Sequence, residues 1–308
     1  MAPAVPAPFR GTPVADPLFG CIEAGGTKFV VGVLRDQGTI LDECRIETSD
    51  PAATIGAATD FLDAAASRFG SFDAIGIASF GPIDIDRRSP HWGRITTTPK
   101  PGWSDIDLAG PLATAFGCPV GFDTDVNGAI LAESLWGNAI GADIACYVTV
   151  GTGIGGGALV EERPVHGSRH PEMGHLIVRR HPLDTGFGGI CPFHGDCLEG
   201  LASGPAIIAR WGASLSDLPP DHPAHEIIAY YLGQLVVAQQ AILSPRRIVM
   251  GGGVLATPGL IDRVRAQARD LANGYYGTED YARLVVAPGL GDKAGLLGAL
   301  ALAQRARR

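Results

Sequence analysis

Basic residues are scarce in this chain, and their scarcity excludes one class of partner. The 308 residues include 24 lysines and arginines against 32 aspartates and glutamates, for a formal net charge of -8. A surface that binds nucleic acid neutralises phosphates with clustered lysine and arginine side chains. We therefore expect no nucleic-acid partner.

Long uninterrupted apolar runs are also missing. The most apolar window, residues 227–243, contains Gln234, Gln239 and Gln240, whereas a membrane-spanning helix needs about 20 predominantly apolar residues. Residues 1–18 are rich in proline and alanine and lack an apolar stretch of signal-peptide length. We expect a buried helix over 227–243, a disordered tail over 1–18 and no membrane partner.

Cysteine is sparse as well. Six cysteines are too few for a disulfide scaffold in a chain of this length. Four of them lie scattered in apolar segments, as small core residues do: Cys21, Cys44, Cys118 and Cys146. This usage fits a reducing, cytoplasmic location best.

Glycine, by contrast, is abundant. The chain has 43 glycines, roughly twice the usual share of about 7%, without the G-X-Y period of collagen. Hydrophobic residues make up 46% and charged residues 18%, which is typical of a soluble globular protein, and the length suffices for two domains. Many backbone positions must therefore need a positive φ or close approach to another group.

The order of the predicted elements indicates a duplicated α/β architecture with a cleft between two halves. Three strands joined by a Gly-Gly turn and a second turn fill residues 20–48, and a helix over 52–69 and a strand over 74–78 follow. The same order recurs as a strand over 145–150, a glycine-rich turn over 151–157 and a strand over 158–160. Strands at 247–250 and 284–287 and a helix at 292–303 complete the chain.

Three glycine-rich turns predict a nucleotide site. Residues 151–156, GTGIGG, match G-x-G-x-x-G, but an apparent strand follows them where a dinucleotide-binding fold requires a helix. Ordinary glycine hairpins are the alternative, yet the N–H groups of several such turns can bind phosphates. We expect a branched side chain at position 153 to block this approach. The predicted nucleotide-binding residues are Gly25, Gly26, Thr27, Lys28, Gly151, Thr152, Gly153, Gly251 and Gly252.

Asp125 lies at the predicted junction between a strand over 119–122 and a helix from residue 126. Aspartate at such a junction is commonly a helix N-cap. The alternative is a general base, kept ionised by the helix dipole and directed into the cleft. Both interpretations stay open from the residues alone, and Asp123 is the next candidate for the base.

A cysteine and histidine cluster gives the sharpest local signal. Cys191, His194 and Cys197 form a C-x2-H-x2-C pattern, and His175 lies upstream in the segment PEMGH. Two thiolates and two imidazoles predict a closed tetrahedral zinc site of the structural type, with no open position for a catalytic water. Chance cysteines in a glycine-rich loop are the alternative.

Several linked motifs in a fixed order carry a resemblance to a known family. They are EAGGTK (23–28), GIASFGPID (76–84), TTPKPGW (97–103), DTDVNGA (123–129), VGTGIGGG (150–157) and PEMGH (171–175), followed by the cysteine cluster, LEG (198–200) and GGG (251–253). With these motifs the chain resembles a ROK (repressor, open reading frame, kinase) sugar kinase of the bacterial fructokinase-like branch. The similarity covers nearly everything after the tail.

The resemblance implies an α/β protein with the two-domain actin-like ATPase (ribonuclease H-like) fold and a central cleft. The N-terminal domain would comprise residues 19–124 and 293–308, and the C-terminal domain, with the zinc-bound loop, residues 125–292. ATP with Mg²⁺ and a hexose would meet in the cleft, where the sugar 6-hydroxyl is phosphorylated and fructose is the favoured substrate. Glucokinase and mannokinase activities are the alternatives, and a homodimer is usual for the family.

The resemblance also assigns roles to individual residues. Asp125 would take the proton from the accepting sugar hydroxyl, while Glu172, His175 and Glu199 would hold other hydroxyls. His175 would act twice, with one ring nitrogen on zinc and the other toward the sugar. Thr124 stands in the sugar site where glucokinases carry asparagine.

Two further departures from the common family pattern favour the fructokinase-like branch over a glucokinase. Glu23 stands where aspartate is typical, which changes the reach toward a Mg²⁺-bound water, and His194 replaces a cysteine ligand. A sugar-sensing regulator of the same family is the alternative from another class. It would need a helix-turn-helix before the first strand, which we do not expect the proline-rich tail to form.

Overall fold

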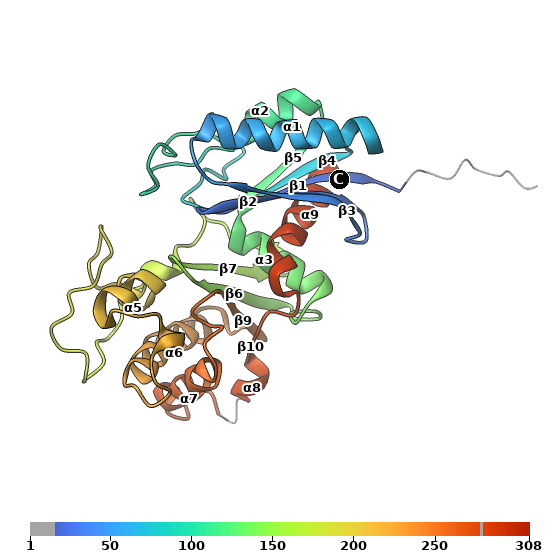
Figure 1. Cartoon of the computed structure of the whole chain (residues 1–308). Coiled ribbons are helices and arrows are strands. Elements are labelled where there is room, and N and C mark those ends of the chain that lie inside the picture. Colours follow the sequence, from blue (N-terminus) through green and yellow to red (C-terminus); the bar gives the residue numbers. More distant parts are fainter. Residues whose placement is uncertain (1–15, 278–279) are drawn as a thin grey trace, which may run out of the picture.

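Two five-stranded mixed sheets organise the protein (Figure 1). The computed structural model describes residues 16–277 and 280–308. Residues 1–15 of the predicted tail lie outside the described residues, and Leu18, which we expected in the tail, already begins the first strand. The strand orders are β3-β2-β1-β4-β5 in the first sheet and β10-β9-β6-β7-β8 in the second.

The first sheet begins with the predicted antiparallel meander. Its strands are β1 (Leu18–Ala24), β2 (Lys28–Arg35) and β3 (Ile40–Glu47), with β4 (Ala74–Ser79) parallel to β1 and β5 (Val120–Thr124) parallel to β4. Side chains alternate along β1, so Phe19 and Cys21 pack on one face and Leu18 and Ile22 on the other. The first face is covered by α9 (Ala294–Arg307), and the second by α1 (Pro51–Phe69) and α2 (Ala109–Phe116).

The second sheet repeats this arrangement. It consists of β6 (Ile144–Val150), β7 (Ile154–Val160), β8 (Arg163–Pro164), β9 (Arg247–Gly251) and β10 (Val285–Val286). Cys146 and Val148 of β6 pack toward α6 (Ala224–Leu243) and α7 (Leu260–Ala272), while Ala145 and Tyr147 pack toward α3 (Asp125–Trp136). Both sheets therefore have helices packed on both faces, while the outer strands β3 and β8 stay partly exposed.

Short helices complete the second half of the chain. They are α4 (Leu198–Ala202), α5 (Gly204–Trp211), α8 (Tyr281–Leu284) and the 3-10 turns η1 (Met173–His175), η2 (Leu215–Asp217) and η3 (Gly291–Lys293). Helix α6 is long and apolar enough to cross a membrane by length and composition. It nevertheless packs in the protein core, as the sequence predicted, and most of its residues are buried.

Helices α3 and α9 lie between the two sheets and touch backbone to backbone (Figure 1). A Cβ atom on Gly298 of α9 would lie 2.4 Å from the carbonyl carbon of Gly128 in α3. Only a pair of glycines permits this approach. The contact matters for function because α3 begins with Asp125, the predicted base.

Three predicted boundaries are wrong. Strand β7 begins at Ile154, so glycines 155–157 belong to the strand and not to the turn. They are small because α3 and η1 lie over them: a Cβ on Gly157 would lie 2.4 Å from Oδ1 of Asn127. The strand expected at 284–287 is shortened to two residues by α8, and the last helix begins at Ala294 and not at 292.

Candidate active site

A pocket of about 590 Å³ lies where the two sheets face each other across the ends of their strands. Its walls come from the β1–β2 turn, the segments after β4 and β5, the β6–β7 turn, residues 170–175 and the cysteine loop. The structure brings these predicted site residues together in it: Gly26, Thr124, Asp125, Gly151, Thr152, Gly153, Glu172, His175, His194 and Glu199.

The remaining predicted residues lie next to this pocket and not in its lining. Gly25 and Thr27 flank Gly26 in the β1–β2 turn, and Lys28 begins β2. Gly251 is the last residue of β9, and Gly252, directly after it, packs against Val150, immediately before the β6–β7 turn. Cys191 and Cys197 are buried beneath the pocket, beside His175.

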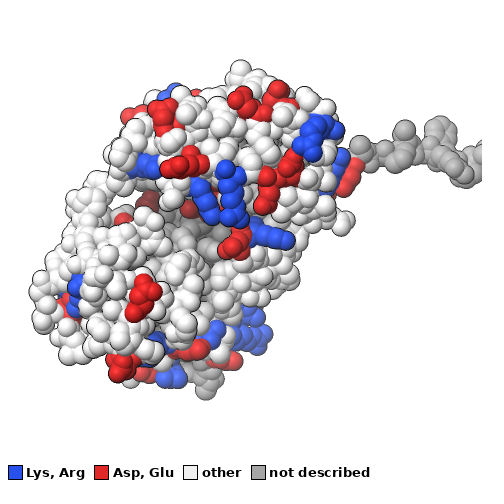
Figure 2. All heavy atoms as spheres, viewed as in Figure 1, with Lys and Arg blue, Asp and Glu red and all other residues white. Residues whose placement is uncertain are grey.

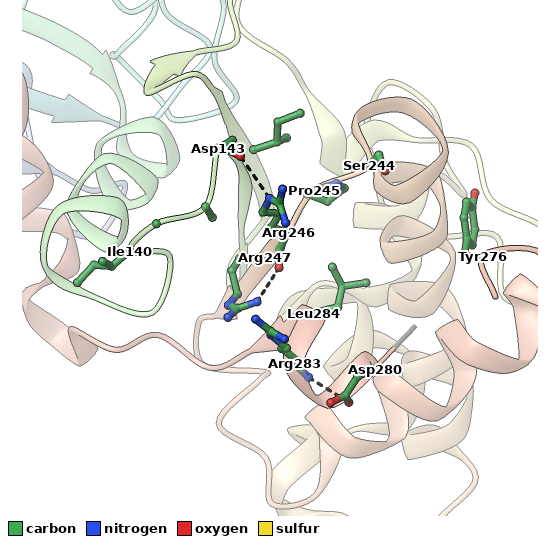
Figure 3. Close-up of a pocket in the computed structure, with 13 residues that line it drawn as sticks. Ile140, Asp143, Ser244, Pro245, Arg246, Arg247, Tyr276, Asp280, Arg283 and Leu284 are labelled. Carbon is green, nitrogen blue, oxygen red and sulfur yellow. Dashed lines mark hydrogen bonds and ion pairs between the residues drawn. The ribbon is translucent and has the colours of Figure 1, made fainter. Parts of the chain in front are cut away.

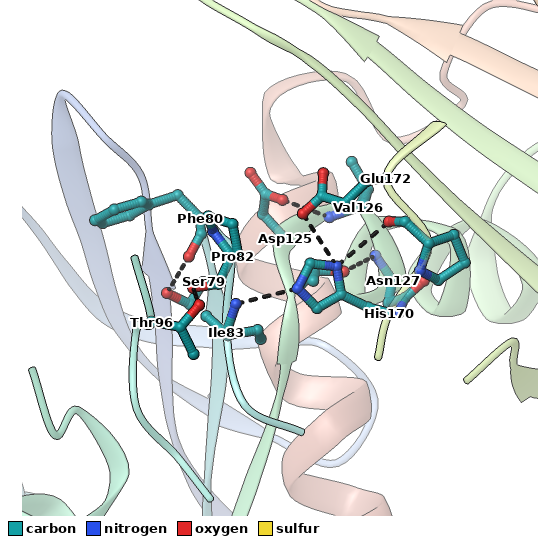
Figure 4. Close-up of polar contacts among 12 residues, drawn as sticks. Ser79, Phe80, Pro82, Ile83, Thr96, Asp125, Val126, Asn127, His170 and Glu172 are labelled. Carbon is teal, nitrogen blue, oxygen red and sulfur yellow. Dashed lines mark hydrogen bonds and ion pairs between the residues drawn. The ribbon is translucent and has the colours of Figure 1, made fainter. Parts of the chain in front are cut away.

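Asp125 is the first residue of α3, and it is not the N-cap. The cap is Thr124, whose hydroxyl oxygen accepts the N–H of Asn127 at 3.2 Å. The interpretation of Asp125 as the cap is therefore wrong, and the predicted sugar-site residue Thr124 has a structural duty. Asp125 accepts the N–H of Val126 at 2.8 Å through Oδ1, and its carboxylate faces the same space as that of Glu172 (Figure 4).

The surroundings of Asp125 make its carboxyl group a weak acid. Burial raises its pKa to about 7, and the negative charges of Glu23 and Glu172 add to the increase. Burial likewise raises the pKa of Glu172, against the lowering effects of His170 and His175. An acid with a pKa near 7 is suited to accept a proton at neutral pH, because about half of it is ionised there and the ionised form is more basic than an ordinary carboxylate.

Asp123, the second candidate for the base, is held in a closed polar network. It is buried, and its carboxylate accepts the N–H of Thr124 at 2.7 Å and the side-chain amide of Asn127 at 2.8 Å. His166 lies 3.0 Å from its other oxygen. Asp123 does not line the pocket. The geometry therefore favours Asp125 as the base.

Glu199 joins the second glycine turn to the opposite wall of the pocket. Its Oε2 atom accepts the N–H of Ile154 at 2.9 Å. A Cβ atom on Gly153 would lie 2.7 Å from that same oxygen. A branched side chain at position 153, which we expect to block the approach of phosphate, would therefore also displace Glu199. At Gly26 and Gly151 an added Cβ meets nothing within 4 Å.

The predicted metal ligands converge. One donor atom from each of four residues lies within 4.8 Å of the others: His175, Cys191, His194 and Cys197. Nδ1 of His175 is 3.7 Å from Sγ of Cys191 and 3.5 Å from Sγ of Cys197. A tetrahedral zinc site with usual bond lengths has N–S edges of about 3.5 Å. The donor set and its spacing fit Zn²⁺.

His170 lines the pocket, although sequence reasoning did not single it out. Its side chain is buried beside Glu172, and its ring meets the backbone of Ile83. The signal available in the sequence was its place directly before the segment PEMGH. Its closeness in sequence to Glu172 and His175, two predicted sugar ligands, is the pattern that indicates a residue of this pocket.

A second pocket, of about 1150 Å³, lies at the far end of the second sheet (Figure 3). Its lining includes the first residue of β6, Ile144, and the first residue of β9, Arg247. Both strands run from there toward the glycine turns, so this pocket is remote from Asp125.

On the face shown in Figure 2, basic and acidic side chains are interspersed.

Comparison with known proteins finds relatives along nearly the whole chain. The model of the ROK family matches residues 19–306. A fructokinase of Zymomonas mobilis is 50% identical over 289 residues, covering 93% of this chain and 96% of that protein. A putative fructokinase of Bacillus subtilis is 44% identical over 293 residues, covering 94% and 96%. The crystal structure of a ROK hexokinase from Thermus thermophilus superimposes with a TM-score of 0.76 at 29% identity, covering 94% of this chain and 98% of that one.

These likenesses confirm the predicted fold class, the actin-like ATPase fold with two mixed sheets. The residue boundaries of the two domains stay a prediction.

Proposed function

The chain belongs to the ROK family, and from that premise we propose that it is an ATP-dependent hexose kinase that converts fructose to fructose 6-phosphate. The relatives that support fructose are the fructokinase and putative fructokinase that cover nearly its whole length. Within the structure, the observation that carries the proposal is Asp125, a carboxyl group with a pKa of about 7 that lines the pocket between the glycine turns and Glu172.

In the proposed reaction, Asp125 orients the 6-hydroxyl of the sugar and accepts its proton as the oxygen attacks the γ-phosphorus of ATP. ADP leaves as the bond between the γ-phosphorus and the bridging oxygen breaks. Phosphoryl transfer depends chiefly on positioning and on charge stabilisation. Glu172, His175 and Glu199 hold the other hydroxyls and so fix which oxygen reaches Asp125. The half-buried position of Asp125 leaves it accessible from the pocket.

The nucleotide is assigned to the glycine turns. Gly26 and Gly151 line the pocket with open space above them, so their backbone N–H groups are available to phosphate oxygens. Gly25, Thr27, Lys28, Thr152, Gly153, Gly251 and Gly252 complete the proposed ATP site. Mg²⁺, which ATP brings with it, neutralises phosphate charge. We assign Glu23, whose charge acts on Asp125, to the ion through its bound water.

The cysteine and histidine cluster is proposed to hold a structural zinc ion. Zinc bound there would fix His175, which lines the pocket, and Cys197, which is the residue directly before α4. Glu199 is the second residue of that helix. The metal would therefore set the position of two proposed sugar ligands without touching the substrate. A cytoplasmic homodimer is part of the same proposal.

A coupled ADP-release assay over a panel of hexoses tests the function. We expect the highest kcat/KM with fructose, lower values with mannose and glucose, and a 6-phosphate product. A preference for glucose or mannose would make the enzyme a glucokinase or mannokinase. Hexose binding without turnover would indicate a sugar sensor that does not bind DNA, and absence of both would reject the proposal.

A further inference from the structure

His170 connects the two sides of the pocket. It follows β8 of the second sheet, and its side chain is 5% exposed. The ring atom Nε2 accepts the backbone N–H of Ile83 at 3.1 Å (Figure 4). Ile83 belongs to the segment after β4 of the first sheet, 87 residues earlier in the sequence. The hydrogen bond therefore spans from one half of the molecule to the other.

This hydrogen bond determines which ring nitrogen carries the proton. Because Nε2 accepts an N–H, a neutral ring must be protonated at Nδ1. Nδ1 lies 3.5 Å from Oε1 of Glu172 and 3.3 Å from the carbonyl oxygen of Pro171. The ring thus accepts at one end from the first half of the molecule. At the other end its donor meets the carbonyl oxygen of Pro171, with the carboxylate of Glu172, a proposed sugar ligand, beside it.

Backbone hydrogen bonds hold the segment that anchors the ring. Ile83 pairs with Ile95 in an isolated antiparallel bridge, and the N–H of Thr96 donates to the carbonyl of Pro82 at 2.8 Å. The ring also packs on Gly81, where a Cβ atom would lie 3.4 Å from Cε1 of His170. Gly81 and Pro82 line the same pocket as Glu172. The imidazole of His170 therefore fixes the segment that carries Glu172 against the opposite wall of the pocket.

We propose that His170 is a positioning residue that latches the segment 170–175 to the wall formed by residues 81–83, and that it thereby sets the affinity for the hexose. The inference rests on the proposed function, because it assumes that Glu172 and His175 hold sugar hydroxyls. A hexose in the pocket must meet both walls at once, so losing the latch costs binding of the sugar before it costs binding of ATP. His170 itself need not touch the substrate.

Three substitutions separate the two ends of the ring. Glutamine at position 170 can place an oxygen near the position of Nε2 and accept the Ile83 N–H. Asparagine can occupy the position of Nδ1 but is too short to reach Ile83. Alanine removes both groups. His91→Ala is the matched control, because His91 is an exposed histidine in the first half of the chain.

The expected kinetic result is a selective change in KM. His170→Ala leaves a buried N–H without its acceptor, so KM for fructose should rise about tenfold or more, with KM for ATP within about twofold. His170→Gln should recover most of the loss, and His170→Asn should not. A proportional fall in kcat with unchanged KM, rescued by neither variant, would mean that the residue serves folding alone and would overturn the proposal.

Hydrogen exchange of the Ile83 amide tests the latch without relying on catalysis. In the native protein this amide should exchange slowly, in His170→Asn and His170→Ala faster, and in His170→Gln slowly again. Wild-type protein that turns over no hexose would defeat the proposed function, and the exchange rates would still decide the latch. Unchanged exchange at Ile83 in folded His170→Asn, as in His91→Ala, refutes it. Should His170→Ala not fold, the asparagine and glutamine pair carries the test.

Discussion

The residues directly before Asp125, and not Asp125 itself, cap helix α3 and hold its first turn. Thr124 caps α3 and Asp123 is held by Asn127 and His166, so Asp125 contributes to the helix start only by accepting the Val126 N–H through Oδ1. Its second carboxylate oxygen is left for chemistry, and an asparagine oxygen can still accept the same N–H. The residue can therefore be changed to asparagine with little effect on the fold.

Substituting Asp125 by asparagine should abolish most activity while sparing stability. Asparagine keeps the size of the side chain but cannot take the hydroxyl proton, and loss of a general base costs roughly 10² to 10⁴ in kcat. KM for ATP should stay within a few-fold, and the Tm should not fall, because Thr124 remains the cap. Steady-state kinetics and thermal melting check both. A folded variant with near-normal kcat would place the base elsewhere.

The rate should also report the pKa of Asp125. Burial holds this pKa at about 7, and only the ionised carboxylate can accept a proton. The fraction ionised falls on the acid side, so kcat/KM for the hexose should drop by up to about tenfold per pH unit below pH 7 and level off above it. A profile of kcat/KM against pH checks this. A flat profile between pH 5.5 and 8 would contradict the assignment.

At the scale of elements, the two glycine turns respond differently to a side chain. Valine at Gly26 should raise KM for ATP by about tenfold or more, since it fills open space above the turn that the phosphates need. Valine at Gly153 should raise KM for fructose as well, because it displaces Glu199. Separate KM values for the two substrates check the pair. Equal effects on both substrates from Gly26→Val would place the nucleotide elsewhere.

The cysteine loop should depend on its metal. Cys197→Ser should lose the bound zinc, and kcat/KM for the hexose should fall by at least about tenfold, because Glu199 and His175 lose their fixed positions. Cys118→Ser, outside the cluster, should retain both metal and activity. Elemental analysis measures the zinc content of each variant, and steady-state kinetics measures its kcat/KM. Full activity in zinc-free wild-type protein would remove the metal from the explanation.

The glycine run at 151–157 shows what local sequence could and could not predict. Its first part is the turn that was expected, because a strand before it and Gly-Thr-Gly within it are local signals. Its last three glycines lie in β7 and make room for α3 and Met173. Glycine is required both where another part of the protein packs closely and where a ligand approaches the backbone. The sequence pattern alone therefore cannot distinguish the two causes.

For the whole molecule, the order of strands and helices was predictable because each element has its own apolar period, and the linked motifs identified the site. The contacts that complete the site were not predictable. Ile83 offers only a backbone N–H to His170, so no side chain in the sequence records the bond. The capping role of Thr124 was hidden in a similar way, since either of two adjacent polar residues can start a helix.

The glycine pair between α3 and α9 has a consequence for how this protein can vary. Gly128 and Gly298 already carry the smallest possible residue, so a gain of atoms at one position cannot be offset by a loss at the other. A larger residue at either position would push the two helices apart, and no substitution at the other position could restore their contact. Gly128 also lies one turn of helix after Asp125. Gly298 is far from the active site in sequence, yet we expect substitutions there to be rejected because they would shift α3 and with it the carboxylate of Asp125.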